Sequence, residues 1–516
     1  MAVSGSRLSL VAGAIAHGGR TAIADAAGEH SYARLLDRSA RAAAALLQGR
    51  RDLEEARVAF FVPPGFTHVA IQWGIWRAGG IAVPLALSYP PAELDYVIRD
   101  AEVSIVVADP AAAETLRPLA EAAGARLVTT TEALSRGAAP DGMLSSDARE
   151  PEAGALPDVV ESRRAMMVYT SGTTGKPKGV VTTHANLRAQ ITALIEAWGW
   201  TEDDRILLVL PLHHVHGIVN VVCSSLRAGA VCEMLPRFDA EETWARIASG
   251  RLTLFMAVPT IYRRLIAAWE AARPERRTAM SEGCRRMRLM VSGSAALPVR
   301  TLERWREISG HTLLERYGMT ELGMALSNPL HGERRPGYVG APLPGVLARL
   351  VDEAGAPVAD GAPGEIEVRG PNVFLEYWRR PDATRDAFRD GWFRTGDTAV
   401  VEDGYYRILG RSSVDIIKTG GFKVSALEIE EELRTHPAVA ECAVVGVDDP
   451  DWGERICAAV ELRDGGALEL GELQGWAKER LAPYKVPRAL RCVDALPRNA
   501  MGKVMKPEVA KLFGGG

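Results

Sequence analysis

The sequence predicts an α/β protein in which helices cover parallel sheets, followed by a small antiparallel β subdomain and a compact α+β unit. Three observations lead to this prediction. Apolar runs typical of buried strands alternate with helical stretches through the first four fifths of the chain. From about residue 337, short strand-like segments are separated by Gly and Pro. After Gly410 and Arg411, helical and strand-like patterns mix up to the C-terminal end.

The strands predicted for the first part rest on six short apolar runs. They are VAFFV (58–62), SIVVA (104–108), AMMVY (165–169), RILLVL (205–210), LTLFMAV (252–258) and RLMVSG (288–293). Between them, segments such as ARLLDRSARAAAALL (33–47) place apolar residues at the spacing of a helix that is buried on one side. Because strand and helix alternate, we expect the strands to pair in parallel.

The later segments predict two smaller units. The β subdomain is expected over about 337–410, and the α+β unit after it. Its helices are expected at 427–436 and 470–481, and its strands at 441–447 and 456–462. We therefore predict an N-terminal domain of residues 1–410 and a C-terminal domain of residues 411–516. The polar, Gly- and Pro-rich segment 136–164 is predicted to be a surface linker.

The composition excludes several classes of protein. The chain has 516 residues, of which 47% are hydrophobic and 24% charged, as in ordinary globular proteins. This excludes intrinsic disorder, collagen and a disulfide scaffold. The formal net charge is −4, whereas a nucleic-acid-binding protein usually has a basic excess. We therefore expect no nucleic-acid partner.

The cysteines and the N-terminal segment predict a cellular location. No two of the six cysteines lie closer than nine positions, which excludes a CxxC zinc motif and favours buried free thiols in a reducing compartment. The first apolar stretch is interrupted by Ser9, Gly13 and His17, which indicates an amphipathic helix rather than a signal peptide. No run of about 18 apolar residues is present, so no membrane span is expected. We expect a cytoplasmic protein.

The strongest chemical signal is the segment YTSGTTGKPKGVV (169–181), which continues an apolar strand-like run. Glycines let backbone N–H groups approach an anion, and hydroxyl and ammonium groups suit phosphate oxygens. A P-loop is excluded because Gly175-Lys176 is followed by Pro177 rather than by Ser or Thr. The candidate phosphate-binding residues are Thr170, Ser171, Gly172, Thr173, Thr174, Lys176 and Lys178.

With six further motifs in the same order, the chain resembles the adenylate-forming, or AMP-binding, enzymes, which include acyl-CoA synthetases. These motifs are PLHHVHG (211–217), SGSAAL (292–297), ERYGMTE (315–321), WFRTGD (392–397), DIIKTGGFKV (415–424) and PRNAMGKVMK (497–506). The resemblance implies a large domain of two helix-covered sheets, a mobile C-terminal cap and a reaction through an acyl-AMP intermediate. In detail the chain is most similar to the malonyl-CoA synthetases, including the mammalian mitochondrial malonate-activating type.

The resemblance also implies roles in binding ATP and a metal ion. Glu321 matches the Mg²⁺ ligand, and Thr320 beside it matches a donor to the α-phosphate. Asp397 matches the acceptor of the ribose hydroxyls, and Arg411 a second contact with ribose or phosphate. Near the nucleotide the resemblance further places Ser294 and Ala295, which would lie against adenine, and Tyr317, Gly318 and Met319.

Near the C-terminal end, Lys503 matches the catalytic lysine that stabilises charge between the carboxylate and the α-phosphate, and Lys506 is the nearby alternative. The hinge of the cap is expected within residues 411–415, where the chain has what looks like one extra residue relative to the family. The segment 418–423 is expected to contact CoA. Its candidate residues are Lys418, Gly420, Gly421 and Lys423, and the alternative is that the two glycines form only a turn between a strand and a helix.

Two arginines are candidates for reading the acid. Arg316 precedes Tyr317 in a position where many relatives have an uncharged residue, and Arg264 lies on a predicted helix expected to line the same pocket. His214 matches a family histidine at the pocket wall. A buried arginine is costly unless a carboxylate meets it, so a pocket arginine predicts a dicarboxylic acid. The alternatives are that either arginine faces solvent or that Arg316 pairs with Glu315.

These observations predict an ATP-dependent malonate:CoA ligase that forms malonyl-AMP and uses ATP, Mg²⁺ and CoA. One alternative is an acyl-CoA synthetase for methylmalonate or another short carboxylic acid. A second is a stand-alone adenylation enzyme that loads a carrier protein, and a third is a non-catalytic nucleotide-binding protein. The intact Lys503, Glu321 and Asp397 argue against the third. The partners are small molecules, and the sequence does not indicate an oligomeric state.

Overall fold

The first part of the chain is built on two large sheets, as the alternation of strands and helices predicts. The computed structural model describes residues 8–135, 156–170, 176–412, 414–463, 466–498 and 504–514. Within these ranges, all six predicted apolar runs form strands of the two sheets. Most strand pairs of the two sheets are parallel. The antiparallel pairs lie toward three of the four sheet edges, at β2, at β13–β15 and at β7, β8 and β18, whereas the edge strand β6 is parallel to β5.

One sheet has nine described strands and the other seven. The order in the first is β15 (Ala341–Pro342), β14 (Gly323–Ser327), β13 (Leu314–Met319), β12 (Leu289–Ser292), β11 (Leu254–Ala257), β9 (Arg205–Leu208), β10 (Val231–Met234), β1 (Thr21–Asp25) and β2 (Gly28–Ser31). The order in the second is β18 (Glu376–Tyr377), β8 (Lys178–Thr183), β7 (Arg164–Thr170), β4 (Ile81–Pro84), β3 (Arg57–Phe61), β5 (Ile105–Ala108) and β6 (Arg126–Thr129). Fully buried Val, Ile, Leu and Phe side chains of these strands form the core.

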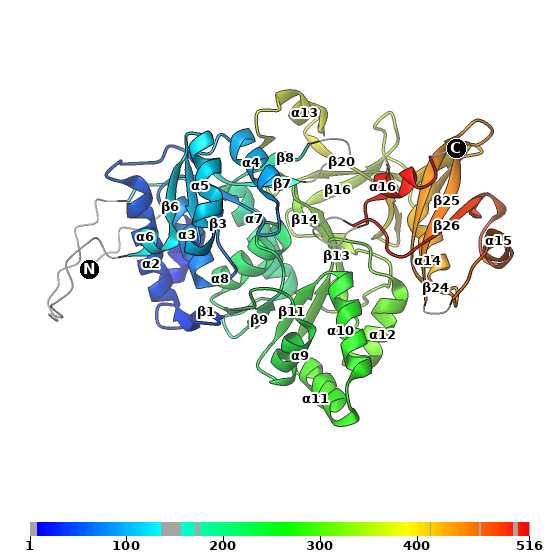
Figure 1. The fold of residues 1–516 in the computed structure, drawn as a ribbon, viewed down its shortest axis with the longest axis horizontal. Helices are drawn as coiled ribbons and strands as arrows, with labels where there is room; N and C mark the ends of the chain where they lie inside the picture. The colour runs from blue at the N-terminus through cyan, green and yellow to red at the C-terminus, as the bar shows by residue number, and fades with distance from the viewer. Residues whose placement is uncertain are drawn as a thin grey trace.

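Helices surround these sheets (Figure 1). They are α1 (Ser9–Ile15), α2 (Tyr32–Leu47), α3 (Phe66–Arg77), α4 (Pro91–Asp100), α5 (Ala113–Ala122), α6 (Thr130–Leu134), α7 (His184–Trp198), α8 (Ser224–Ala228), α9 (Ala240–Ala248), α10 (Pro259–Ala271), α11 (Pro274–Arg285), α12 (Val299–Ser309) and α13 (Pro381–Asp386), with a π-helix at His216–Cys223. The prediction of an amphipathic first helix is confirmed, since α1 buries Val11 and Ala14. Most of the predicted linker, 136–155, lies outside the described residues.

The small β subdomain forms a third, antiparallel sheet. Its strands are β16 (Leu347–Val351), β17 (Gly364–Arg369), β20 (Trp392–Glu402) and β19 (Phe388–Arg389), with β21 (Tyr405–Arg411) beside β20. The subdomain is less separate than the sequence predicts. Strand β15 joins the nine-stranded sheet and β18 pairs with the edge strand β8 of the other large sheet. This pairing brings Tyr377 into the neighbourhood of the phosphate motif.

The C-terminal unit has its own sheet and apolar clusters. Its strands are β23 (Phe422–Ser425), β22 (Ile416–Thr419), β25 (Gly453–Leu462) and β24 (Val439–Asp449), with β26 (Ala489–Val493) beside β25. Helices α14 (Ala426–Leu433), α15 (Leu470–Lys478) and α16 (Lys506–Lys511) cover it. In Figure 1 this unit lies at the right-hand end, away from α2 and α6. The boundary at residue 411 stays a prediction.

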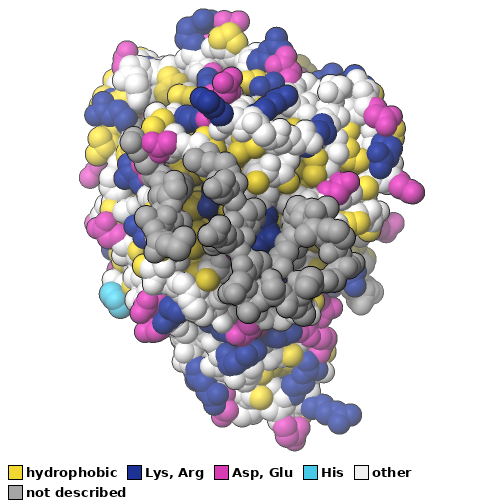
Figure 2. Space-filling model, turned by 90° about the vertical axis from the view of Figure 1, so that its left-hand side faces the viewer, with side chains coloured by type: hydrophobic (Ala, Val, Ile, Leu, Met, Phe, Trp, Pro, Cys, Tyr) yellow, Lys and Arg dark blue, Asp and Glu magenta, His cyan; other side chains and the backbone are white. Residues whose placement is uncertain are grey.

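The surface mixes charges of both signs. Figure 2 shows acidic and basic side chains interspersed over one face, as the near balance of charge suggests. Across the described ranges, no helix is both long enough and apolar enough to cross a bilayer. All six cysteines are free, and five are buried as predicted. The prediction is wrong for Cys492, which is exposed because β26 lies beside β25 at the edge of its sheet.

Candidate active site

The predicted ribose-binding carboxylate joins three strands. Asp397 in β20 lies directly across from Arg411 in β21, and Arg411 Nε donates to Asp397 Oδ1 at 3.0 Å. The Tyr317 hydroxyl of β13 donates to the other carboxylate oxygen at 2.5 Å. Burial and the neighbouring carboxylate hold the pKa of Tyr317 well above its usual range. The structure therefore brings together three of the residues predicted to bind ATP.

Glu321 lies in the turn that follows β13 and is buried, as is Thr320. The Tyr377 hydroxyl donates to Glu321 Oε1 at 2.9 Å. Burial raises the pKa of Glu321, and the charge of Asp397 adds to the rise. A cation nearby would stabilise the charged form of this buried carboxylate, and the charged form is the one that binds a metal ion. Among the described residues, no group of three or more His, Cys, Asp or Glu side chains is arranged to hold a metal.

Tyr377 also links the phosphate motif to Glu321, because it contacts a lysine of that motif. Thr170 ends β7 and pairs across the hairpin with Lys178 at the start of β8. The Lys178 ammonium lies over the Tyr377 ring, 4.9 Å from its centroid, and Lys176 lies 5.5 Å from the Tyr96 ring. The Lys178 ammonium thus lies over the ring of the tyrosine that donates to the buried carboxylate of Glu321. The predicted residues Ser171, Gly172, Thr173 and Thr174 lie outside the described residues.

Arg316 is buried, and its guanidinium is largely unpartnered. Its side chain is 3% exposed, and Nη2 donates to Ser294 Oγ at 3.3 Å. In the part of the chain that the structure describes, Nε and Nη1 have no hydrogen-bond partner although both are buried. Burial lowers the pKa of Arg316 to about 9. Both sequence alternatives, a solvent-facing Arg316 and a pair with Glu315, are wrong, and two buried donors of the guanidinium have no acceptor among the described residues, which is uncommon for buried polar groups.

His216 completes the surroundings of Arg316. Its Nδ1 lies 3.2 Å from Ser294 Oγ, and burial together with the charge of Arg316 lowers its pKa well below the usual value, so the ring is neutral. His216 begins the π-helix, a distortion that occurs often at functional sites. The motif PLHHVHG carried the signal for His216, but only His214 was selected as a site residue. His214 is half-buried and its Nδ1 accepts a hydrogen bond from the His216 N–H at 3.3 Å.

The backbone after β12 is shaped to admit the guanidinium. A Cβ atom on Gly293 would lie 2.4 Å from Arg316 Cζ, so a larger residue there would displace the guanidinium from its present position. Ser294 takes a left-handed conformation, with φ at +68°, which is uncommon for a residue other than glycine. Its hydroxyl meets Arg316 and His216, whereas the sequence prediction placed Ser294 and the exposed Ala295 against adenine. That prediction stays untested, as do those for Gly318 and Met319 in β13.

Arg264 is not brought into this cluster. Its side chain is exposed on α10, and its guanidinium lies 4.7 Å from the centroid of the Phe238 ring. The structure thus agrees with the alternative that Arg264 faces solvent. A helix has several faces, and the sequence did not show which one α10 turns toward the pocket.

The segment predicted to bind CoA forms a β-hairpin. Gly420 and Gly421 connect β22 to β23 with φ values of +55° and +83°, as a tight hairpin turn requires. The glycines therefore form a turn between two strands, not between a strand and a helix. The Lys418 side chain is exposed, and the backbone of Lys423 pairs with Lys418. The turn geometry alone accounts for both glycines, and contact with CoA stays a prediction.

The two lysines considered near the C-terminal end differ in what the structure shows. Lys503 lies outside the described residues. Lys506 is described, and its ammonium lies 2.6 Å from Asp415 Oδ1 and 2.7 Å from Glu430 Oε1. The Lys506 ammonium therefore forms ion pairs with two carboxylates of the C-terminal unit. These ion pairs argue against Lys506 as the lysine that reaches the reacting atoms.

Two family models match the chain. Residues 12–378 match the family described as AMP-binding enzyme, and residues 428–503 match the AMP-binding enzyme C-terminal domain. The mitochondrial malonate–CoA ligase ACSF3 of Mus musculus is 48% identical, over 96% of this chain and 89% of that protein. The malonate–CoA ligase of Arabidopsis thaliana is 44% identical, over 90% of this chain and 79% of that protein.

Solved structures agree with these matches. The crystal structure of ATP-bound MatB from Rhodopseudomonas palustris superposes with a TM-score of 0.88 at 38% identity, covering 98% of this chain and 99% of that chain. The o-succinylbenzoate coenzyme A synthetase MenE of Bacillus subtilis in complex with AMP superposes with a TM-score of 0.83 at 27% identity, over 97% of each chain. The first of these structures contains ATP and the second AMP.

A buried carboxylate beside the site gives a test of pH dependence. Glu315 accepts the Gly337 N–H at 3.0 Å, and burial raises its pKa to about 8 from 4.5, with the charge of Glu431 adding to the rise. The folded protein keeps a proton that the unfolded chain releases in this window, so stability falls as the pH rises from about 4.5 to about 8. Glu315→Gln removes this ionisation and keeps the acceptor.

We expect the thermal unfolding midpoint of the parent protein to fall relative to that of Glu315→Gln as the pH is raised through this window. Calorimetric scans at several pH values measure the difference. Glu307→Gln is the control, because Glu307 is exposed and pairs with Arg304 at the surface. Parallel pH profiles for the parent and Glu315→Gln would contradict the assignment.

Proposed function

Since the chain belongs to the AMP-binding enzyme family, we propose that it is an ATP-dependent malonate–CoA ligase. The resemblance predicted from the motifs is confirmed by the family models and by relatives named malonate–CoA ligase at 44–48% identity. In the proposed reaction, a malonate carboxylate oxygen attacks the α-phosphorus of ATP, and the bond to the β-phosphate breaks with release of pyrophosphate. The thiol of CoA then attacks the acyl carbon, loses its proton and displaces AMP.

The observation that carries the choice of acid is the buried Arg316 with two free donors. A monocarboxylic acid uses its one carboxylate in the attack and leaves this cation unpaired. Malonate has a second carboxylate, which would bond to Nε and Nη1 and offset the cost of burying the charge. Because His216 is neutral, it adds no second positive charge beside Arg316, and its ring N–H can donate a hydrogen bond to the same carboxylate.

The nucleotide would bind along the line from the phosphate motif to Asp397. Asp397 and Arg411 would hold the ribose, since a carboxylate accepts hydrogen bonds from two hydroxyls. Thr170 and Lys178 border the place where the phosphates would lie. Thr320 would donate to the α-phosphate, and Lys503 is proposed to stabilise the charge that develops between the two reactants. Lys418, Gly420, Gly421 and Lys423 remain the proposed contacts with CoA.

A magnesium ion fits the residues present. Mg²⁺ is usually held by one or two carboxylates together with substrate phosphates, and Glu321 is one buried carboxylate next to the proposed phosphate site. When bound, the ion would neutralise charge on the phosphates. The Tyr377 hydroxyl fixes one carboxylate oxygen of Glu321 and so orients the group.

The remaining predictions concern the partners of the protein and its location in the cell. The substrates are small molecules, as the ligase family implies. The cytoplasmic location stays a prediction, since the relative from Mus musculus is named mitochondrial.

Pyrophosphate release with a panel of acids tests the proposed function. The panel is acetate, propionate, malonate, methylmalonate and succinate, each with and without CoA. We expect malonate to give the highest kcat/KM and the thioester to form only when CoA is present. Methylmalonate is the nearest competitor, because one methyl group discriminates by only about 1–3 kcal/mol. If acetate outperforms malonate, the dicarboxylate assignment is wrong.

Replacement of Arg316 tests the role of its charge. A bidentate pair of arginine and carboxylate contributes roughly 1.5–3 kcal/mol, so Arg316→Leu should lower kcat/KM for malonate by about 10- to 100-fold. The loss with acetate should be much smaller. Arg264→Leu is the matched control, because Arg264 is exposed, and it should leave both activities near those of the parent. Equal losses with both acids in Arg316→Leu would show that Arg316 is structural.

A further inference from the structure

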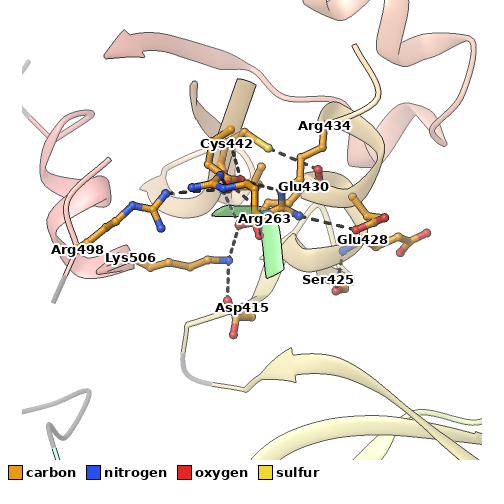
Figure 3. Close-up of polar contacts among 12 residues, drawn as sticks. Arg263, Asp415, Ser425, Glu428, Glu430, Arg434, Cys442, Arg498 and Lys506 are labelled. Atoms are coloured by element: carbon orange, nitrogen blue, oxygen red, sulfur yellow. Dashed lines mark hydrogen bonds and ion pairs between the residues drawn. The ribbon is translucent and has the colours of Figure 1, made fainter. Parts of the chain in front are cut away.

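Lys506, the first residue of α16, lies between two carboxylates of the C-terminal unit (Figure 3). Its ammonium is 2.6 Å from Asp415 Oδ1 and 2.7 Å from Glu430 Oε1, and the three side chains are 10%, 17% and 4% exposed. Burial alone lowers the pKa of Lys506, but the two carboxylates outweigh it and raise the pKa. We call these three residues the Lys506 cluster.

Glu430 forms the fixed side of the Lys506 cluster. Its Oε1 accepts the Val444 N–H at 2.8 Å, and its Oε2 lies 3.3 Å from Arg434 Nη2. Arg434 in turn donates to Glu441, which also pairs with Arg263 on α10. Glu430 is therefore held by its own unit without help from Lys506. The Lys506 ammonium therefore has one partner, Glu430, that other residues already hold in place. Its second partner is Asp415, whose position the ammonium can determine.

Asp415 connects the Lys506 cluster to the nucleotide site. Its Oδ2 accepts the Arg411 N–H at 3.0 Å, while its Oδ1 forms an ion pair with the Lys506 ammonium. The Arg411 carbonyl accepts the N–H groups of Val414 and Asp415, which closes a short turn. Arg411 Nε then donates to Asp397 at 3.0 Å. A continuous path of hydrogen bonds and ion pairs thus runs from α16 to the carboxylate proposed to bind ribose.

We propose that Lys506 is a positioning residue for the nucleotide site, because it holds Asp415 and thereby fixes the backbone from which Arg411 reaches Asp397. The proposal rests on the proposed function only in taking Asp397 and Arg411 as nucleotide contacts. Without the ammonium, Asp415 and Glu430 repel each other, and Asp415 no longer constrains the Arg411 N–H. Among the described residues, no direct hydrogen bond or ion pair joins the Arg316 side chain, at the acid end of the site, to the Lys506 cluster.

The direct test compares three variants of the full chain. Lys506→Met removes the charge, and Lys506→Arg keeps it and can bond both carboxylates. Lys511→Met is the matched control, because Lys511 lies on the same helix but is exposed and pairs only with Glu508 in the contacts described. Calorimetric titration with Mg-ATP gives the affinity without any acid or CoA, and a thermal scan gives the unfolding midpoint.

We expect Lys506→Met to weaken ATP binding by about tenfold or more, Lys506→Arg to stay within about threefold of the parent, and Lys511→Met to be unchanged. In the assay with malonate, the KM for ATP should rise in Lys506→Met and the KM for malonate should not. A folded Lys506→Met that binds ATP like the parent would overturn the proposal. Because ATP binding is measured alone, a parent that fails to activate malonate would refute the proposed function and leave this test valid.

A charge-compensated pair covers the case in which Lys506→Met does not fold. Glu430→Gln keeps the pair of Lys506 and Asp415 and should bind ATP like the parent. Glu430→Gln with Lys506→Met removes one charge of each sign, so no excess of buried negative charge remains. We expect this double variant to bind ATP about tenfold more weakly than Glu430→Gln at a similar unfolding midpoint. Equal affinities would show that Lys506 serves only to neutralise buried carboxylates.

Discussion

The buried guanidinium of Arg316 is the constraint on which the arrangement of the site depends. A charge taken out of water is costly unless a partner meets it, and two of its donors have no partner in the residues that the structure describes. The neighbours are arranged around it: Gly293 leaves space, Ser294 adopts a left-handed backbone and His216 stays neutral. Burying this charge without a partner costs stability in the free protein, and the proposed binding of a second carboxylate would offset that cost.

Strand β13 joins this end of the site to the nucleotide and to the C-terminal unit. Successive side chains on a strand point to opposite faces, so Arg316 lies on one face while Glu315 and Tyr317 lie on the other. Tyr317 reaches Asp397, and Asp397 is joined through Arg411 to Asp415 and Lys506. In the proposed function, acid and nucleotide would thus be bound from neighbouring positions of one strand. The nucleotide side, but not the acid side, is connected to the C-terminal helix α16.

Local patterns in the sequence were enough to predict most of the fold and part of the site. The apolar runs gave the strands because burial on both faces demands continuous Val, Ile and Leu. The motifs indicated Glu321, Asp397 and Arg411, whose roles stay predictions, and the structure brings Arg411 and Tyr317 to Asp397. The sequence could not show that Ser294 faces Arg316, because this depends on one backbone angle after β12. The sequence also could not show that Arg316 is buried and Arg264 exposed, since burial is set by the packing of distant strands. Nor could it identify Tyr377, which contacts Glu321 only because β18 pairs with β8.

A structure of the protein bound to malonyl-AMP tests the central claim most directly, namely that Arg316 reads the second carboxylate of the acid. The account predicts that this carboxylate lies within about 3 Å of Nε or Nη1 of Arg316, the distance of a charge-assisted hydrogen bond. The ribose would then lie at Asp397. A second carboxylate that faces solvent, with the Arg316 donors still unpartnered, would contradict the account.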